Sequence, residues 1–390
     1  MTVFVDRDKL SPRHIPSRLP HRERQIDLAI SFFRDFLEGK GGRYTRIIQF
    51  VGPIGVGKTC TAHHVAKALK TAAAKIGLRL LFAYLNLRLE APSKYVLYRS
   101  LAYKIDPCLE SRSLSPKEQL LNVIRYVKAT GSYLLLVVDE IDEFLKKSSE
   151  EGLVYDLTRL SELYPGERSG VMGLVFIARS LDWRSLLSDA EKSTLGNLMI
   201  GFKPYSRDEV YDILEYRASE AFRKGAVGPE VLEYISEATV RHAGSDIRYA
   251  LDVLLYSGVL AENEGETRVT LDHVRAVLGS FDHVLTSRDI AEMNTEEKLV
   301  LLSVARALKM TGKQYVALKE VRSSLRIICE QYNINPMSEG LFEDVLQKLY
   351  EEGMVDIKGV AKIGISRMPV EKLSLFLDEI IGNITTELIL

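Results

Sequence analysis

The chain has 390 residues, of which 46% are hydrophobic and 27% are charged, and its formal net charge is −1. This length allows two or three domains, and the composition is that of a globular protein. A near-neutral chain has no overall attraction for polyanions, so any nucleic-acid surface has to be a local patch. No apolar run approaches the roughly 20 residues of a membrane span, and the polar start lacks the apolar core of a signal peptide. We therefore expect a soluble, cytoplasmic protein that does not enter a membrane.

Residues 1–24 are predicted to form an irregular, basic arm, and residues 26–38 an amphipathic helix. The apolar segment RIIQFV (46–51) predicts a strand, and the helix formers from Cys60 onward predict a helix. Between them lies GPIGVGKT (52–59), which fits the pattern G-x-x-x-x-G-K-[ST]. A strand before this pattern and a helix after it are the context of a phosphate-binding P-loop, so a chance glycine turn is the weaker interpretation.

In a P-loop, backbone N–H groups turn toward phosphates, and the helix N-terminus adds its partial positive charge. Lys58 is expected to reach the β- and γ-phosphates, and Thr59 to bind Mg²⁺. Cys60 follows the loop directly, where a small buried filler is a better interpretation than a modifiable thiol. The nucleotide-binding residues predicted from this stretch are Gly52, Gly55, Val56, Gly57, Lys58, Thr59 and Cys60.

The next segments alternate between strand and helix character. We predict a buried strand at 78–90, helices at 95–105 and 116–129, and apolar strands at 133–142 and 171–180. Such alternation favours an α/β fold with a mostly parallel sheet and helices on both faces. The strand YLLLVVDEID ends in two carboxylates: Asp139 is predicted to hold Mg²⁺ and Glu140 to act as the general base of ATP hydrolysis. The alternative is that both only cap the next helix.

From residue 202 to 279 only helical patterns are visible, at 206–224, 229–242, 245–263 and 271–280. A linker is expected at 281–294. Three further helices, at 295–310, 316–332 and 338–354, precede two short β-like runs, which is the outline of a winged helix. The predicted domains are a nucleotide-binding core at 1–201, a helical lid at 202–290 and a winged helix at 291–390.

These motifs together resemble the archaeal origin-recognition/cell-division-cycle family of DNA replication initiators, which are AAA+ ATPases with a winged helix. The resemblance rests on IPSRLPHRERQI, VGPIGVGKTCTA, LLLVVDEID, FKPYSRDEVYDILEYR and HAGSDIRYALDVLLYSG, and covers nearly the whole chain. It implies ATP or ADP with Mg²⁺ as cofactors, and double-stranded origin DNA as a partner. It also implies other initiator copies or paralogues, the replicative helicase, and a nucleoid-associated location.

The resemblance also assigns nucleotide contacts outside the P-loop. It places the segment 20–23 near the adenine, and it implies contacts from Tyr205, Arg217 and the second-sensor residue Arg248. Taken alone, an arginine at a helix start such as Arg248 could face bound phosphate or simply solvent, and the sequence by itself favours solvent. Where the family has an asparagine as first sensor, this chain has Arg179 and Ser180.

A second departure concerns the residue that acts on a neighbouring subunit's nucleotide. Ala190, with Lys192 nearby, stands where the family often has an arginine. Such an arginine contributes about 10³–10⁵ to the rate where it operates. We therefore expect slow hydrolysis, with the nucleotide serving mainly as a switch.

The predicted DNA-binding residues fall in four groups. Seven bases between Lys298 and Arg326, against the single acid Glu320, predict a phosphate-facing surface, although charge runs are usually solvated faces. The recognition helix at 338–354 is crowded by acids, so base reading by it is in doubt. The wing is predicted to be the better contact, although its lysines could equally keep an edge strand soluble. The resemblance implies a further DNA contact from a helical insertion at 87–100, which could equally be an ordinary helix start. The candidates are Lys319, Arg322, Arg326, Ser338, Lys358, Lys362, Arg367, Arg88, Lys94, Tyr95 and Arg99.

Two other functions stay open. One is an AAA+ DNA motor of the branch-migration type, against which the missing arginine near Ala190 argues. The other is an ATP-bound DNA-binding regulator with vestigial hydrolysis. Intact Asp139 and Glu140 argue against a complete loss of hydrolysis.

Overall fold

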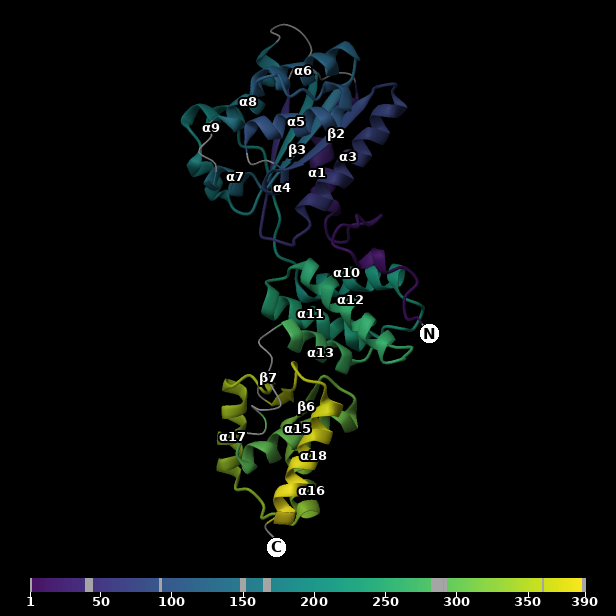
Figure 1. Cartoon of the computed structure of the whole chain (residues 1–390), viewed down its shortest axis with the longest axis vertical. Coiled ribbons are helices and arrows are strands. Elements are labelled where there is room, and N and C mark those ends of the chain that lie inside the picture. The colour runs from purple at the N-terminus through teal and green to yellow at the C-terminus, as the bar shows by residue number, and fades with distance from the viewer. Residues whose placement is uncertain are drawn as a thin grey trace. The chain divides into compact units, whose positions relative to one another are not determined.

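The computed structural model describes residues 2–38, 45–90, 93–147, 152–163, 170–281, 290, 293–359 and 361–387 (Figure 1). The chain divides into two compact units. One comprises Ile15–Glu209 and Gly244–Ile247, and the other comprises Met1–His14, Val210–Ala243 and Arg248–Leu390. The predicted domain boundaries after residues 201 and 290 stay predictions.

The first unit is built on a five-stranded sheet whose strand order is β2-β3-β4-β1-β5. All four neighbouring pairs are parallel, as the alternation of strands and helices predicted. The strands are β1 (Arg46–Val51), β2 (Leu80–Asn86), β3 (Tyr133–Asp139), β4 (Val171–Ala178) and β5 (Met199–Gly201).

Both faces of this sheet are covered, which is why its central strands are apolar throughout. Leu134, Leu136 and Val138 pack in a cluster with side chains of α5 (Lys94–Ile105) and α6 (Pro116–Ala129). Leu135 alternates with them onto the opposite face and is 0% exposed. On that face the Cα of Gly173 lies so close to the Phe33 ring that an added Cβ would be 2.5 Å from it.

The remaining elements of the nucleotide-binding half are helical. The α-helices are α1 (Glu23–Ser31), α2 (Arg34–Leu37), α3 (Lys58–Lys75), α4 (Leu87–Glu90), α7 (Ile141–Lys147), α8 (Leu153–Thr158) and α9 (Asp189–Leu195). The short 3-10 helices are η2 (Pro107–Leu109), η3 (Leu160–Leu163) and η4 (Leu181–Leu186), whereas η1 (Arg7–Leu10) belongs to the other unit. Two predictions here were wrong in part. The strand expected at 78–90 ends at Asn86, because LRLE forms the helical turn α4, and the helix expected at 26–38 is divided into α1 and α2.

The second unit contains the lid helices and the winged helix. The lid helices are α10 (Arg207–Ala221, whose first turn belongs to the other unit), α11 (Pro229–Ala243), α12 (Ile247–Asn263) and α13 (Leu271–Phe281). The winged helix contains α15 (Thr295–Thr311), β6 (Tyr315–Ala317), α16 (Leu318–Tyr332), α17 (Glu339–Glu351), β7 (Asp356–Lys358), β8 (Lys362–Gly364) and α18 (Val370–Glu387).

The winged helix has its own core and a small antiparallel sheet of order β6-β8-β7. The predicted three helices and hairpin are present. Strand β6 and helix α18 were not predicted, and α18 packs along α15. The predicted linker 281–294 falls mostly outside the described residues. Among the helices that are described, none is both long and apolar enough to cross a membrane.

Candidate functional site

The P-loop leaves the carboxyl end of β1 and enters α3, as predicted. Gly55 and Gly57 have φ of 74° and 86°, a left-handed conformation that glycine adopts without steric cost. At Gly55 an added Cβ would also lie 1.9 Å from the carboxylate of Asp246. Glycine is therefore required at this turn by both conformation and space.

Two other predicted residues, Val56 and Gly52, pack the P-loop against the rest of the unit. Val56 is fully buried, and its carbonyl accepts a hydrogen bond of 2.9 Å from Nε of Arg22. At Gly52 an added Cβ would lie 2.2 Å from the carbonyl oxygen of Phe202. Cys60, in the first turn of α3, is half-buried and forms no disulfide with the described cysteines.

Lys58 is the first residue of α3 and is 9% exposed. Its Nζ donates hydrogen bonds of 2.6 Å to the carbonyl of Gly52 and of 2.5 Å to that of Pro53. The ammonium group is thus folded back over the loop, which keeps a positive charge where the loop's N–H groups would gather phosphate oxygens.

Thr59, the next residue, connects the P-loop with the carboxylate at the end of β3. Oγ1 of Thr59 donates to Oδ2 of Asp139 across 2.6 Å. A hydroxyl and a carboxylate are hard oxygen ligands of the kind that Mg²⁺ prefers, so these residues fit the predicted metal. The Tyr84 hydroxyl donates to the same oxygen across 2.8 Å. Burial, with the Asp139 carboxylate beside it, raises the pKa of Tyr84 far above its ordinary value, so the hydroxyl keeps its proton and donates.

Glu140 occupies a conformation that is uncommon for a side-chain-bearing residue, with φ of 59°. Its N–H donates to Oδ1 of Asp139 across 2.8 Å, which holds the turn after β3. Arg179, the first residue after β4, lies with Nη2 3.7 Å from Oε2 of Glu140 and Nη1 3.4 Å from Oε1 of Glu143. Ser180 instead caps η4 and donates to Asp182 across 2.9 Å.

Arg22 was not singled out individually by sequence, yet it is 3% exposed. Its guanidinium donates to the carbonyls of Val56 and Lys203, each across 2.9 Å, and lies 3.7 Å from the centre of the Tyr205 ring. Burial raises the pKa of Tyr205 well above its ordinary value. The predicted contact residue Tyr205 is therefore stacked on an arginine that supports the P-loop.

The two predicted lid arginines belong to the other compact unit, so their contact with a nucleotide stays a prediction. Arg217 is 5% exposed and donates to the carbonyl of Lys9 in the N-terminal arm. Arg248 is exposed and follows the segment 244–247 directly in sequence. In that segment the Ile247 N–H lies 3.4 Å from the carbonyl oxygen of Gly55.

The DNA-contact candidates on and near α5 form ion pairs or hydrogen bonds with other residues of the chain. Lys94 pairs with Asp156 at 3.2 Å, Arg99 pairs with Glu110, and the Tyr95 hydroxyl donates to the carbonyl of Arg112 across 3.0 Å. Arg88, on α4, lies with Nη1 3.9 Å from Oε2 of Glu140. These contacts leave their DNA role a prediction, and they place Arg88 beside the candidate general base.

The basic surface predicted between Lys298 and Arg326, on α15 and α16, is smaller than the sequence suggested. Lys298 is 5% exposed and donates to a backbone carbonyl, so it is not part of a surface. Arg322 pairs with Glu339 at 2.6 Å and Glu343 at 3.1 Å, which neutralises two acids of the predicted recognition helix. Lys319 and Arg326 are exposed. Ser338 is the N-cap of α17 and accepts a hydrogen bond from Leu341.

The wing presents its bases unequally. Lys362 on β8 is exposed, and it forms no ion pair with another residue of the described chain. Lys358 on β7 pairs with Glu237 of the lid helix α11 and lies over the Tyr315 ring. Arg367 is half-buried, and its carbonyl lies against Gly279 of α13.

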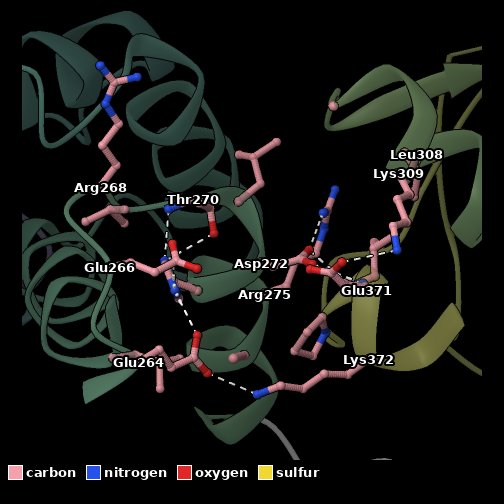
Figure 2. Close-up of a pocket in the computed structure, with 18 of the residues that line it drawn as sticks. Glu264, Glu266, Arg268, Thr270, Asp272, Arg275, Leu308, Lys309, Glu371 and Lys372 are labelled. Carbon is pink, nitrogen blue, oxygen red and sulfur yellow. Dashed lines mark hydrogen bonds and ion pairs between the residues drawn. The ribbon is translucent and has the colours of Figure 1, made fainter. Parts of the chain in front are cut away.

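A pocket of about 410 Å³, with several charged side chains in its lining, lies within the second unit between the helices α12 and α13 and the helices α15 and α18 (Figure 2). Its charges are balanced internally: Lys372 pairs with Glu264 at 3.0 Å and Lys309 with Glu371 at 3.1 Å. His273 faces Glu264, but its Nδ1 accepts the Thr270 N–H at 2.9 Å, so the neutral ring carries its proton on Nε2. A proton there blocks metal ligation, and we assign this pocket a structural role.

The fold and the P-loop geometry define a nucleotide-binding protein of the AAA class with a helical lid and a winged helix. Three family models match the chain: an AAA domain at 42–187, a Cdc6 AAA+ ATPase-type lid domain at 211–278 and a CDC6 C-terminal winged helix domain at 288–368. The ORC1-type DNA replication protein 1 of Aeropyrum pernix is 30% identical over 328 residues, covering 83% of this chain and 81% of that protein. The chain therefore belongs to the Orc1/Cdc6 family of archaeal DNA replication initiators.

Solved structures agree with this fold over almost the whole chain. Cdc6p from Pyrobaculum aerophilum has a TM-score of 0.74 at 23% identity, covering 98% of this chain and 100% of its own. The Aeropyrum pernix ORC1 protein in complex with DNA has a TM-score of 0.63 at 25% identity, covering 99% of each chain. The Aeropyrum pernix ORC2 protein, in ADPNP and ADP complexes, has a TM-score of 0.64 at 22% identity, covering 98% of this chain and 100% of its own.

Proposed function

We propose that this protein binds ATP and double-stranded origin DNA, hydrolyses ATP slowly as a switch, and helps to recruit or load the replicative helicase. The observation that supports this most directly is the Thr59–Asp139 hydrogen bond of 2.6 Å beside the Lys58 ammonium. This arrangement places two oxygen ligands for a metal ion and a phosphate-binding ammonium group close together at the end of one parallel sheet. Membership of the initiator family supplies the biological context.

In this proposal Gly52–Thr59 and the start of α3 hold the phosphates, and Thr59 and Asp139 hold Mg²⁺. Bound Mg²⁺ would offset charge on the phosphate oxygens. Glu140 takes one proton from water, the water oxygen bonds to the γ-phosphorus, and the bond from that phosphorus to the β,γ-bridging oxygen breaks. Tyr205, Arg217 and Arg248 are proposed as the lid's nucleotide contacts.

DNA is proposed to contact Lys319, Arg326 and Lys362, three exposed bases of the winged helix. Phosphate contacts of this kind position a protein on the duplex, and base contacts would have to come from the start of α17. Other initiator copies or paralogues, and the helicase, are proposed partners that follow from the family alone.

The test combines fluorescence anisotropy with origin and scrambled duplexes, in ATP and in ADP, and multiple-turnover ATP hydrolysis with and without DNA. An initiator should bind the origin duplex more tightly and show almost no stimulation of hydrolysis by DNA. Strong stimulation would favour a DNA motor, and hydrolysis below detection with intact ATP binding would favour a regulator with vestigial chemistry. Lys58→Ala, which removes the P-loop ammonium, is the control for ATP binding.

A further inference from the structure

Arg275, in the lid helix α13, is a buried arginine whose guanidinium joins three segments of the second unit. Its side chain and backbone together are only 4% exposed. Nε donates to the carbonyl of Ile365 across 2.8 Å, Nη1 donates to Oδ1 of Asp272 across 2.7 Å, and Nη2 donates to the carbonyl of Lys313 across 3.4 Å. Taking a guanidinium out of water is costly unless it is paired and hydrogen-bonded. These acceptors therefore hold Arg275 in one geometry, and two of them are backbone carbonyls of the winged helix.

The two carbonyls lie at one end of the small sheet of the wing. Lys313 comes just before β6, and Ile365 comes directly after β8. Because β6 and β8 are antiparallel neighbours, both carbonyls flank the same end of the sheet. Lys362 begins β8 at the opposite end, where β6 also leads into the first turn of α16 with Lys319. Arg275 thus holds the sheet at the end away from two of the proposed DNA contacts.

Asp272, the ion-pair partner of Arg275, holds the chain that follows the wing. Its Oδ1 accepts the Val370 N–H at 3.1 Å, and its Oδ2 accepts the Glu371 N–H at 3.0 Å. Figure 2 shows this carboxylate beside Glu371. The first N–H groups of a helix have no partner within it, and a carboxylate is favoured at this terminus. Asp272 of the lid therefore caps α18, and with Arg275 it fixes the connection between β8 and α18 at both of its ends.

A second lid helix, α11, supports the wing from the side. Glu237 pairs with Lys358 on β7 and accepts a hydrogen bond of 3.2 Å from the Tyr315 hydroxyl on β6. Arg241 lies 3.7 Å from Asp356 on β7. Each strand of this sheet has only three residues, and so small a sheet depends on packing against neighbouring elements for its stability. The lid supplies part of that support.

We propose that Arg275 and Asp272 are positioning residues for DNA binding: they fix the wing to the lid in the conformation in which Lys362 reaches a DNA phosphate. The inference rests on the proposed function, in which exposed bases of the winged helix contact DNA. The planar fork of an arginine can serve several acceptors at fixed angles, which the single ammonium of a lysine cannot. DNA affinity therefore depends on lid side chains whose own partners are protein groups.

The test is a double-mutant cycle in the full chain, with Arg275→Lys, Lys362→Ala and both together. Anisotropy of a fluorescein-labelled duplex of mixed sequence, in saturating ATP, gives the Kd of each. Arg275→Lys keeps the positive charge and loses the fork, so it should weaken binding. The factor by which Lys362→Ala raises the Kd should be smaller in the Arg275→Lys background, by about threefold or more, because the two residues act through one element. A merely structural role would lower the folded fraction and leave that factor unchanged.

Arg268→Lys is the matched control. Arg268 is an exposed arginine that lines the lid side of the same pocket, and its guanidinium points away from the winged helix in Figure 2. This variant should bind the duplex as the wild type does and leave the cost of Lys362→Ala unchanged. If Arg275→Lys does not fold, as judged by circular dichroism, Asp272→Asn takes its place in the cycle. Its amide oxygen lacks the charge that pairs with Arg275 and caps α18.

A second readout does not involve DNA. Hydrogen exchange, measured by mass spectrometry, should be faster in peptides of β7 and β8 for Arg275→Lys than for the wild type, while peptides of α16 exchange as before. An equal cost of Lys362→Ala in both backgrounds, or unchanged exchange in the wing, would overturn the positioning role and leave the proposed function standing. If Lys362→Ala does not weaken binding in the wild type, or if the wild type binds no duplex, the proposed DNA contact itself fails, and the positioning role fails with it.

Discussion

The Thr59 hydroxyl and the Asp139 carboxylate, which are far apart in sequence, share a hydrogen bond of 2.6 Å. This contact joins the start of α3 to the end of β3 and defines the centre of the candidate ATP site. The Tyr84 hydroxyl at the end of β2 completes it by donating to the same carboxylate oxygen. Three elements thus converge on one oxygen, and its surroundings can be tested one group at a time.

Replacing Tyr84 by Phe should destabilise the first unit by about 1.5–3 kcal/mol, because the buried Asp139 carboxylate loses a charge-assisted hydrogen bond. Trp183 is the only tryptophan of the chain, lies in this unit and is 1% exposed. Its fluorescence during urea unfolding reports the unit selectively. Tyr103→Phe, at an exposed tyrosine, is the matched control. Equal midpoints for both variants would show that the Tyr84 hydroxyl contributes nothing to the site.

Stability should fall on acidification partly through His63, which contacts the Tyr84 ring. Burial lowers the pKa of His63 from its ordinary value of 6.5, with a smaller opposing effect from Asp139. As the pH falls, His63 of the unfolded chain binds a proton near pH 6.5, whereas His63 of the folded protein binds one only at a lower pH. The stability that the neutral ring contributes above pH 6.5 is therefore lost as the pH falls from 6.5 toward the folded-state pKa. We expect His63→Gln to lose less stability than the wild type between pH 7.5 and 5.5, measured by Trp183 fluorescence. His242→Gln, at an exposed histidine, should behave as the wild type, and an unchanged loss in His63→Gln would contradict this assignment.

Arg217 is expected to hold the N-terminal arm as well as serve its proposed lid role. Its guanidinium donates to the carbonyls of Lys9 and Ser11 from a buried position. Arg217→Ala leaves the Lys9 carbonyl without this donor, which should destabilise the second unit by about 1–3 kcal/mol. Limited trypsin digestion should then cut the arm near Lys9 and Arg13 faster than in the wild type. Arg207→Ala, at an exposed arginine paired with Asp208, is the control, and unchanged arm cleavage in Arg217→Ala would refute the tether.

The two wing lysines should differ in DNA binding. Lys362 is exposed, whereas the Lys358 ammonium is paired with Glu237. Lys362→Ala should weaken binding to every duplex and reduce the slope of log K against log salt by about 1. Lys358→Ala should change that slope less, because its charge is already offset. Salt titrations followed by anisotropy measure both slopes, and the reverse order would show that the wing approaches DNA through β7.

The P-loop and the carboxylate pair could be predicted from sequence because each is a local pattern after an apolar strand. Tyr84 and Arg22 could not, since their roles depend on contacts with Asp139 and Tyr205 that only the fold creates. The basic surface predicted between Lys298 and Arg326 was too large for a similar reason. Charge counting does not reveal that Lys298 is buried or that Arg322 pairs with acids of α17. Local sequence patterns therefore predicted which residues form the candidate site. Contacts between residues far apart in sequence determine which charged side chains stay exposed.

The most direct test of the central claim is DNA binding as a function of nucleotide. Anisotropy is measured with an origin duplex and a scrambled duplex, in ATP and in ADP, for the wild type, Lys58→Ala and a Lys319/Arg326/Lys362→Ala variant. The account predicts tighter binding to the origin duplex, a difference between ATP and ADP that Lys58→Ala abolishes, and weakened binding in the triple variant. Equal binding to both duplexes, unaffected by nucleotide and by the triple variant, would contradict it.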